Sequence, residues 1–265
     1  FYRYYASNAV SGDVWAEDAA AFVTDLQTLT ADVTLWLAAD SITGKGEGEA
    51  LQQWRDLSGN RLHAFQLDSN RQPVYSSNAF NGYPAMQFDG ADDYMDGPGW
   101  NLSVQTMFLV LRLDATAPNI SGVFAQKNAD ARNIRNNAST ADWLWPGTAN
   151  SGDFCNGGAV SVNGENTPTH SNQDHVLLEV AASPLAFQYR LSQPLNSRYF
   201  KGDLAELIAF DGTLSDEEKA ELGMHLEAKY GLDTAYVRVD NTGGATSIGS
   251  TTATLNGRVN YTDGG

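Results

Sequence analysis

The sequence predicts an all-β protein: an antiparallel two-sheet sandwich with one C-terminal helix, and partial β-sandwich modules at both ends. Three observations lead to this fold class. Apolar runs of strand length recur along the chain, turn signals rich in Gly and Asn separate them, and a single segment has the caps and spacing of a substantial helix. The 265 residues exceed what one ordinary sandwich needs, which favours more than one module.

The two ends of the chain differ from the middle in their sequence pattern. Residues 1–24 contain two strand-like runs around a turn, and residues 25–34 follow as a linker. Residues 233–265 form a second linker and further alternating runs around Gly243 and Gly244. Each end breaks off with its apolar alternation intact, so we expect the chain to be an excerpt of a longer polypeptide. A two-stranded fragment is marginal alone in water, which predicts that each end needs a partner.

Residues 35–232 are predicted to form one continuous domain of short strands. The domain opens with an apolar run from Leu35 to Asp40, and turn signals such as Asn81-Gly82 punctuate the rest. Many short strands with this punctuation are typical of a sandwich or barrel. The later strand-like runs are Ala85–Phe88, Thr106–Leu113, Val123–Ala125, Val160–Val162, Val176–Val180 and Leu204–Phe210.

One substantial helix is predicted, from Asp216 to Tyr230. Ser215 and Glu218 fit a capping box at its start, and Gly231 closes it. Further residues recur at helical spacing and predict a stripe that faces a core. The stripe consists of Leu222, His225, Leu226, Lys229 and Tyr230.

Charge and cysteine content restrict the possible partners. The 16 Lys and Arg against 32 Asp and Glu give a net charge of −16, and nucleic acid and anionic lipid are disfavoured because binding them needs a cationic surface. Cys155 is the only cysteine, which excludes an intrachain disulfide and a zinc-cysteine cluster. No run approaches the roughly 20 apolar residues of a membrane span. The lack of disulfides argues against a small secreted animal domain and leaves open a bacterial surface protein, in which a large core makes disulfides unnecessary. We therefore expect a secreted or cell-surface protein of bacterial origin.

Four motifs in a fixed order resemble the laminin-G/concanavalin A-like lectin-glucanase superfamily, over residues 35–232. They are Leu35-Trp36-Leu37-Ala38-Ala39-Asp40, then Trp54-Arg55-Asp56-Leu57-Ser58-Gly59-Asn60 with His63-Ala64, then Phe88-Asp89-Gly90-Ala91-Asp92-Asp93-Tyr94, and finally Gly202 to Asp211 followed by Leu214 to Glu218. The two ends resemble parts of fibronectin type III-like modules. Residues 1–24 resemble the last two strands of such a module, and residues 247–265 resemble its first strands.

This resemblance implies a two-sheet jelly roll with the helix lying across one edge of the sandwich. It also implies a non-catalytic adhesive or structural segment of an exported multidomain protein. Its partners would be a glycan, together with neighbouring modules of the same polypeptide or copies of itself arranged head-to-tail. Two alternatives stay open: a carbohydrate-binding module of a larger secreted glycoside hydrolase, and a hydrolase with an unrecognised acid pair.

The sequence lacks the acidic triplet that the glucanases of this superfamily carry on one strand. Glycoside hydrolysis requires two carboxyl groups that flank the scissile bond. The nearest strand carboxylates are Asp203 and Glu206, which are three residues apart and should point to opposite faces of a regular strand. We therefore predict that the chain is not an enzyme. Trp143 and Trp145 share one face of a predicted strand beside Asp142, and we expect them to form a stacking platform for sugars or, alternatively, part of the core.

Two loops are candidate calcium sites, because Ca²⁺ prefers carboxylate and amide oxygens. One loop carries Asp56 and Asn60, and the other carries Asp89, Asp92 and Asp93. The alternative is that both loops are acidic turns, in which the side chains of Asp56 and Asp89 accept hydrogen bonds from nearby backbone N–H groups.

Overall fold

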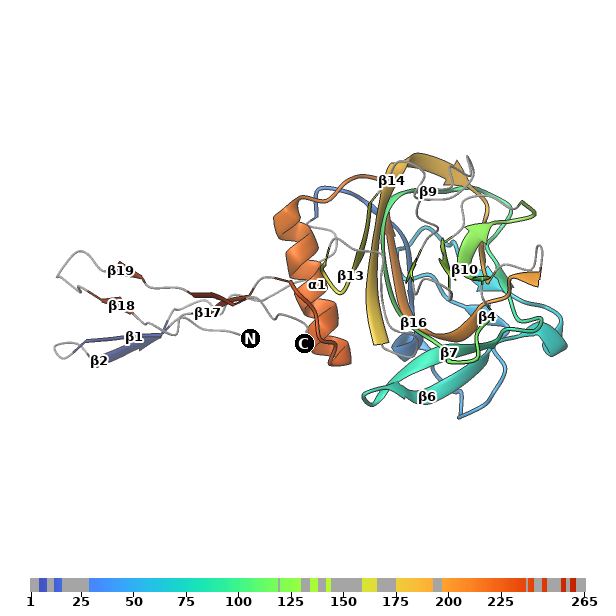
Figure 1. Ribbon diagram of the computed structural model, residues 1–265, viewed down its shortest axis with the longest axis horizontal. Coiled ribbons are helices and arrows are strands. Elements are labelled where there is room, and N and C mark those ends of the chain that lie inside the picture. The colour runs from blue at the N-terminus through green and yellow to red at the C-terminus, as the bar shows by residue number, and fades with distance from the viewer. Residues whose placement is uncertain are drawn as a thin grey trace.

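The computed structural model describes residues 29–118, 120–129, 134–137, 142–143, 159–165, 175–192 and 197–236, together with short strands in the two ends. Two antiparallel seven-stranded sheets lie face to face, and helix α1 (Asp216–Tyr230) packs beside one of them (Figure 1). The predicted all-β sandwich is therefore confirmed. Six of the seven runs predicted as strands lie within observed strands, and the first, Leu35–Asp40, is a strand as far as Ala38 and then continues into a 3₁₀ turn.

The sheet next to the helix is called here the helix-side sheet. Its order is β13-β14-β9-β16-β7-β6, and β3 also pairs with β16. Both β7 and β3 pair with the same strand: β7 with Lys201 to Leu204, and β3 with Glu206 to Phe210. The bounds are β13 (Ala159–Val162), β14 (His175–Phe187), β9 (Leu102–Leu113), β16 (Lys201–Phe210), β7 (Tyr83–Asp89), β6 (Val74–Phe80) and β3 (Val33–Ala38).

The second sheet, called the opposite sheet, has the order β12-β11-β10-β15-β8-β5-β4. Two 3₁₀ turns, η2 (Ala39–Ser41) and η3 (Ser69–Arg71), lie in the connections. The strand bounds are β12 (Asp142–Trp143), β11 (Ile134–Asn137), β10 (Ile120–Gln126), β15 (Tyr189–Leu191), β8 (Met95–Asp96), β5 (Ala64–Phe65) and β4 (Gln53–Trp54).

Strand β9 shows why the fold has two cores. Its side chains alternate between the two faces of the helix-side sheet, as the period of a strand requires. Leu109 and Leu111 join the core between the sheets, whereas Phe108 and Val110 join a second core beneath α1. Each such buried side chain contributes about 2 kcal/mol of hydrophobic stabilisation. The run in β9 is thus continuously apolar because both faces of its sheet are covered.

Helix α1 confirms the predicted bounds and caps. The Ser215 side chain accepts a hydrogen bond from the Glu218 backbone, the Glu218 carboxylate accepts one from the Ser215 backbone, and Gly231 ends the helix in the left-handed conformation at φ 63°. Two details differ from expectation. The helix covers the outer face of the helix-side sheet rather than an edge of the sandwich, since its buried side chains pack on residues of β6, β7, β9 and β16. His225, predicted on the buried stripe, is exposed.

A β-bulge in β16 corrects the prediction for its two carboxylates. The pairing of β16 with β9 shifts register between Leu204 and Glu206, so one extra residue stands on β16. Asp203 pairs with side chains on the outer face, and Glu206 contacts the helix on that same face. Asp203 and Glu206 therefore share a face, although three residues separate them. The spacing rule for a regular strand is wrong here because it assumes an unbroken alternation.

The strands described in the two ends pair among themselves. In the N-terminal end β1 (Tyr5–Asn8) pairs with β2 (Gly12–Trp15). In the C-terminal end β17 (Arg238–Asp240) pairs with β20 (Arg258–Asn260), and β18 (Ala245–Thr246) pairs with β19 (Thr254–Leu255). The fibronectin-like assignment of these ends stays a prediction. No helix in the described part of the chain is long and apolar enough to cross a membrane.

Candidate functional site

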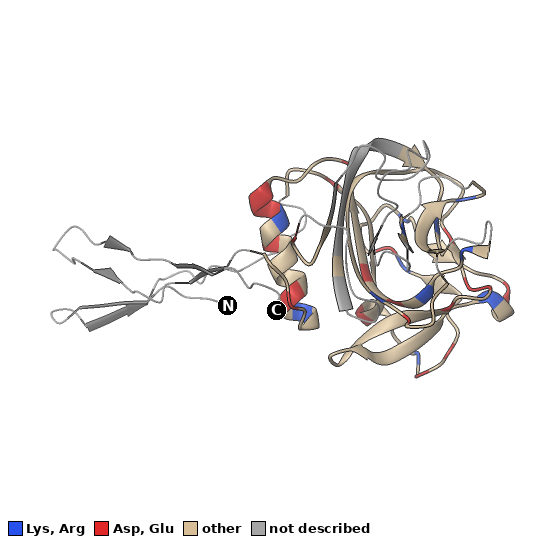
Figure 2. Ribbon diagram, viewed as in Figure 1, with Lys and Arg blue, Asp and Glu red and all other residues tan. Residues whose placement is uncertain are grey.

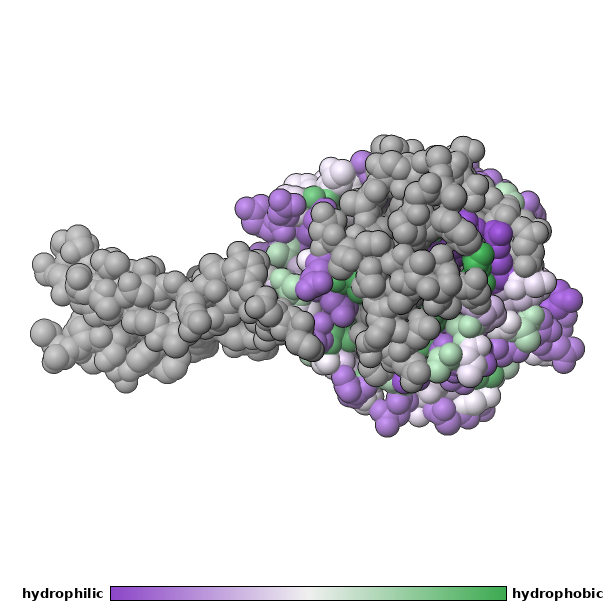
Figure 3. Space-filling view, in the orientation of Figure 1, coloured by the Kyte–Doolittle hydropathy of each residue, from purple (hydrophilic) through white to green (hydrophobic). Residues whose placement is uncertain are grey.

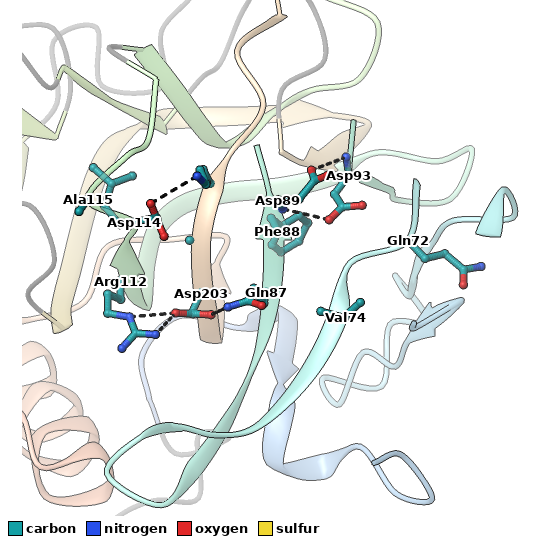
Figure 4. Close-up of a pocket in the computed structure, with 13 residues that line it drawn as sticks. Gln72, Val74, Gln87, Phe88, Asp89, Asp93, Arg112, Asp114, Ala115 and Asp203 are labelled. Carbon is teal, nitrogen blue, oxygen red and sulfur yellow. Dashed lines mark hydrogen bonds and ion pairs between the residues drawn. The ribbon is translucent and has the colours of Figure 1, made fainter. Parts of the chain in front are cut away.

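A cleft with a volume of about 660 Å³ lies at the end of the helix-side sheet where β16 begins (Figure 4). Its walls come from the β6–β7 hairpin, from β9 with the loop that follows it, and from β16, and Gln72 and Asp93 contribute from loops beside the hairpin. The lining is mainly polar and charged. It consists of Gln72, Val74, Gln87, Phe88, Asp89, Asp93, Arg112, Leu113, Asp114, Ala115, Lys201, Gly202 and Asp203.

A row of three polar side chains crosses β9, β16 and β7 in this cleft. Asp203 stands opposite Arg112 on one side and Gln87 on the other. The Arg112 Nε donates to Asp203 Oδ2 at 2.9 Å, Arg112 Nη2 donates to the same oxygen, and Gln87 Nε2 donates to Oδ1 at 3.2 Å. The Asp203 side chain is only 4% exposed, whereas that of Arg112 is 34% exposed. A buried carboxylate therefore orients a guanidinium whose other N–H groups remain available to a ligand.

The strand backbones approach closely where β16 enters the cleft. A Cβ atom on Gly202 would lie 2.1 Å from the Arg112 carbonyl oxygen, so only glycine fits at this position. Beside it, the Lys201 ammonium lies 3.5 Å from Asp114 Oδ1 and donates a hydrogen bond to Thr116. Lys201 is thus a second cation of the cleft that already has a carboxylate partner.

Three carboxylates gather at the rim of the cleft, from Asp89, Asp92 and Asp93. One carboxylate oxygen of each lies within 4.8 Å of the others. The backbone N–H of Asp89 donates to Asp93 Oδ2 at 3.0 Å, and Asp89 Oδ1 accepts from the backbone of Ala91 at 2.8 Å. Burial, together with the negative charges of Asp89 and Asp92, raises the pKa of Asp93 to about 7 against the lowering effect of the Asp89 hydrogen bond. Asp89 thus forms the predicted turn, within a set of carboxylates that could share a cation.

Asp56, the other predicted carboxylate ligand, is hydrogen-bonded at both oxygens. Oδ1 accepts from the backbone N–H of Trp36 and Ser58, and Oδ2 accepts from the Ser58 hydroxyl and the Leu62 N–H, at 2.9–3.0 Å. Asn60 turns its amide nitrogen inward to the carbonyls of Val33 and Thr34. The alternative interpretation, a structural turn, is confirmed for Asp56. Its four hydrogen bonds join the loop to β3 and leave its lone pairs little room for a metal ion.

The predicted sugar platform lies largely outside the described residues. Asp142 and Trp143 form β12, of which the backbone alone is described, and Trp145 lies outside the described residues. Among the described residues a different aromatic side chain, Trp100, is 56% exposed. The coloured part of the surface in Figure 3 is mostly hydrophilic, with small apolar areas between polar ones. The sugar platform therefore stays a prediction.

Glu206 shares a face with the cleft residues but is closed off from them by the helix. Oε1 accepts from Trp36 Nε1 at 2.7 Å, and Oε2 accepts from the Tyr230 hydroxyl and the Lys229 ammonium, each at 2.8 Å. The Glu206 side chain is 3% exposed, and Lys229 also lies 3.0 Å from Asp40 Oδ2. Glu206 is therefore enclosed by hydrogen-bond donors and is not placed to act with Asp203 on a substrate.

The sequence identified Asp89 and Asp93 as site candidates but missed Gln87, Arg112 and Lys201. No local motif marks these three, because each lies on a different strand and only the pairing of β7, β16 and β9 brings them together. No family model, curated protein or solved structure matches the chain. The laminin-G/concanavalin A-like assignment therefore stays a prediction, and the chemistry of the cleft is the basis for the function proposed below.

Proposed function

We propose that this chain is a non-catalytic adhesive or structural segment of an exported, multidomain bacterial protein, and that its cleft binds glycan. The row of Arg112, Asp203 and Gln87 is the observation that carries the proposal. A sugar hydroxyl both donates and accepts hydrogen bonds, and this row offers guanidinium donors beside an amide that can do either. Because the three groups lie on paired strands and bind one another, little side-chain entropy is lost on binding.

The charges of the cleft favour a neutral glycan. Arg112 and Lys201 are each paired with a carboxylate, while Asp89 and Asp93 add negative charge that no cation in the lining balances. The whole chain carries a net charge of −16, and acidic residues also cluster at the start of α1 (Figure 2). Acidic oligosaccharides would be repelled by this surface. In this proposal the sandwich is a jelly roll of the laminin-G/concanavalin A type, and its fibronectin-like ends pair with neighbouring modules or with other copies.

Binding to an array of neutral and acidic oligosaccharides tests the proposal, followed by calorimetry with the best ligand. We expect the Arg112→Gln variant to lose at least tenfold in affinity, about 1.4 kcal/mol. Gln87→Ala should weaken binding too, and it keeps the Arg112–Asp203 pair that supports the fold. Arg55, which is exposed and does not line the cleft, supplies the matched control Arg55→Gln.

Two results would contradict the proposal. One is that no oligosaccharide binds, or that Arg112→Gln and Gln87→Ala both bind as the Arg55→Gln control does. The other is the release of reducing ends from β-glucans by the purified chain, which would show catalysis and favour the hydrolase alternative.

We also propose that Ca²⁺ binds the carboxylates of Asp89, Asp92 and Asp93 at the rim of the cleft. Their oxygens are close enough to share one ion, and neutralising the mutual repulsion would stabilise the folded state. Saturating Ca²⁺ should raise the melting temperature relative to EDTA. Asp92→Asn should reduce this rise, whereas Asp233→Asn, at an exposed position, should leave it unchanged. Identical melting curves in Ca²⁺ and EDTA would contradict the site.

A further inference from the structure

The turn of the β6–β7 hairpin holds the C-terminus of α1. Its two central residues have positive φ angles, 45° at Asn81 and 95° at Gly82, as a two-residue type I′ turn requires. The Asn81 Nδ2 donates to the carbonyl oxygens of Tyr230 and Gly231, at 2.7 and 3.2 Å. The last carbonyls of a helix have no partner within the helix, so the Asn81 side chain caps α1 from outside.

The two turn residues are also placed to react with one another. An asparagine amide is most open to attack by the next backbone nitrogen when glycine follows, because glycine has no Cβ to obstruct the approach. Both Asn81 and Gly82 are exposed, and a Cβ added at Gly82 would have no atom within 4 Å. The surroundings of this turn are therefore open to water and to the backbone movement that the reaction needs.

We propose that Asn81 deamidates spontaneously and that this modification releases the C-terminus of α1 from the hairpin. The Gly82 nitrogen forms a bond to Asn81 Cγ, the Cγ–Nδ2 bond breaks, and the departing ammonia takes the proton of the Gly82 N–H. Water then opens the cyclic imide to aspartate or isoaspartate, so water is the only reactant consumed. This inference does not depend on glycan binding.

The carboxylate that results cannot replace the amide. It has no N–H to donate, and its oxygens face the carbonyl oxygens of Tyr230 and Gly231 at the negative end of the helix dipole. The last turn of α1 also supplies the Lys229 and Tyr230 donors to Glu206. Repulsion at the hairpin therefore weakens the part of the helix that encloses this buried carboxylate.

A second Asn-Gly turn, which follows β13, provides an internal comparison. Asn163 and Gly164 also have positive φ angles, 52° and 81°, but their surroundings are closed. A Cβ added at Gly164 would lie 2.9 Å from the Tyr236 nitrogen, and Asn163 Oδ1 accepts from the Leu177 N–H at 2.8 Å. We expect Asn81 to react at least about tenfold faster than Asn163, a difference of about 1.4 kcal/mol in activation free energy.

Incubation of the full chain at mildly alkaline pH, followed by peptide mass mapping, tests the reaction. The peptide that holds Asn81 should gain the mass of an amide-to-acid conversion and divide into aspartate and isoaspartate forms, ahead of the peptide that holds Asn163. A synthetic peptide of residues 75–87 provides the rate of the same pair without the fold.

The melting temperatures of two variants test the effect on the helix. Asn81→Asp carries the product of the reaction and should melt below the original chain. Asn81→Gly also lacks the amide but places no carboxylate against the helix, so it should melt above Asn81→Asp. Circular dichroism of each variant reports that the sandwich is folded.

Conversion of Asn81 ahead of Asn163, with the lowest melting temperature in Asn81→Asp, supports the proposal. Conversion of the synthetic peptide but not of the folded chain would overturn it, because the fold would then protect Asn81. Equal rates at Asn81 and Asn163 would show that the surroundings of the turns do not matter, which overturns it as well. The release of α1 is refuted if Asn81→Asp melts with the original chain or with Asn81→Gly.

Discussion

Two carboxylates on the outer face of β16 lie three residues apart in opposite surroundings. Glu206 is under the helix, where Trp36, Lys229 and Tyr230 satisfy both of its oxygens. Asp203 is in the cleft, where its partner Arg112 remains 34% exposed. The same face of one sheet is thus divided into a closed half and an open half. The difference arises because α1 covers Glu206 but not Asp203. A charge that the helix buries must be paired within the protein, whereas the partner of an uncovered charge can also bind water or a ligand.

The two halves also differ in whether their carboxylates are paired with cations. In the closed half, Lys229 lies between Glu206 and Asp40, so each carboxylate faces a cation. At the rim of the open half, burial of the Asp93 carboxyl group raises its pKa to about 7, and two carboxylate neighbours act in the same direction. The closed half is therefore built for stability. The open half keeps an electrostatic strain that a cation, a proton or a ligand can relieve.

The largest expected effect comes from removing the carboxylate of the closed half. Glu206→Ala leaves the Lys229 ammonium and the Trp36 and Tyr230 donors without their shared acceptor, and we expect a loss of about 3–5 kcal/mol in the free energy of unfolding. Asp203→Ala is the matched variant in the open half, and a loss of about 1–2 kcal/mol is expected because water can reach Arg112. Urea unfolding followed by tryptophan fluorescence measures both. Equal losses would remove the distinction between the halves.

Asp93→Asn should act in the opposite direction, in EDTA at pH 8. The folded-state pKa of about 7 lies above the ordinary value of 3.8, so the charged carboxylate destabilises the fold above pH 7, and this penalty disappears as the pH falls towards 4. Asparagine carries no charge and can still accept the Asp89 hydrogen bond. After allowance for screening by solvent we expect a gain of about 1 kcal/mol at pH 8 and little change at pH 4. A loss of stability at pH 8 would show that Asp93 is not strained.

The smallest effect is expected at the start of the helix that covers the closed half. Hydrogen bonds from the backbones of Ser215 and Thr30 lower the pKa of Glu218 to about 2, against an ordinary value of 4.5. The resulting stabilisation is present above pH 4.5 and is lost as the pH falls towards 2. Glu218→Ala should cost about 1 kcal/mol at pH 7 as a lost cap, and less near pH 2. Glu217→Ala, at an exposed site in the same turn, is the control, and an equal cost there would dismiss the capping role.

The sequence by itself determined those features that depend on near neighbours. The bounds of α1 follow from Ser215, Glu218 and Gly231, which act within one turn of the helix ends. The apolar runs placed β7, β9 and β16 correctly, since strand period is a local property. The structural turn at Asp56 was also foreseen among the alternatives, because a side chain that accepts hydrogen bonds from the next few residues needs no distant partner for its first bond.

Only the tertiary structure decided where the chemistry lies. The bulge after Leu204, seen in the pairing of β16 with β9, places Glu206 on the same face as Asp203. Gln87, Arg112 and Lys201 meet in the cleft because their strands pair, and no local sequence pattern predicts that pairing. Such features arise from the packing of segments that are distant in the sequence, and hydrophobic periodicity does not predict which of these segments will be in contact.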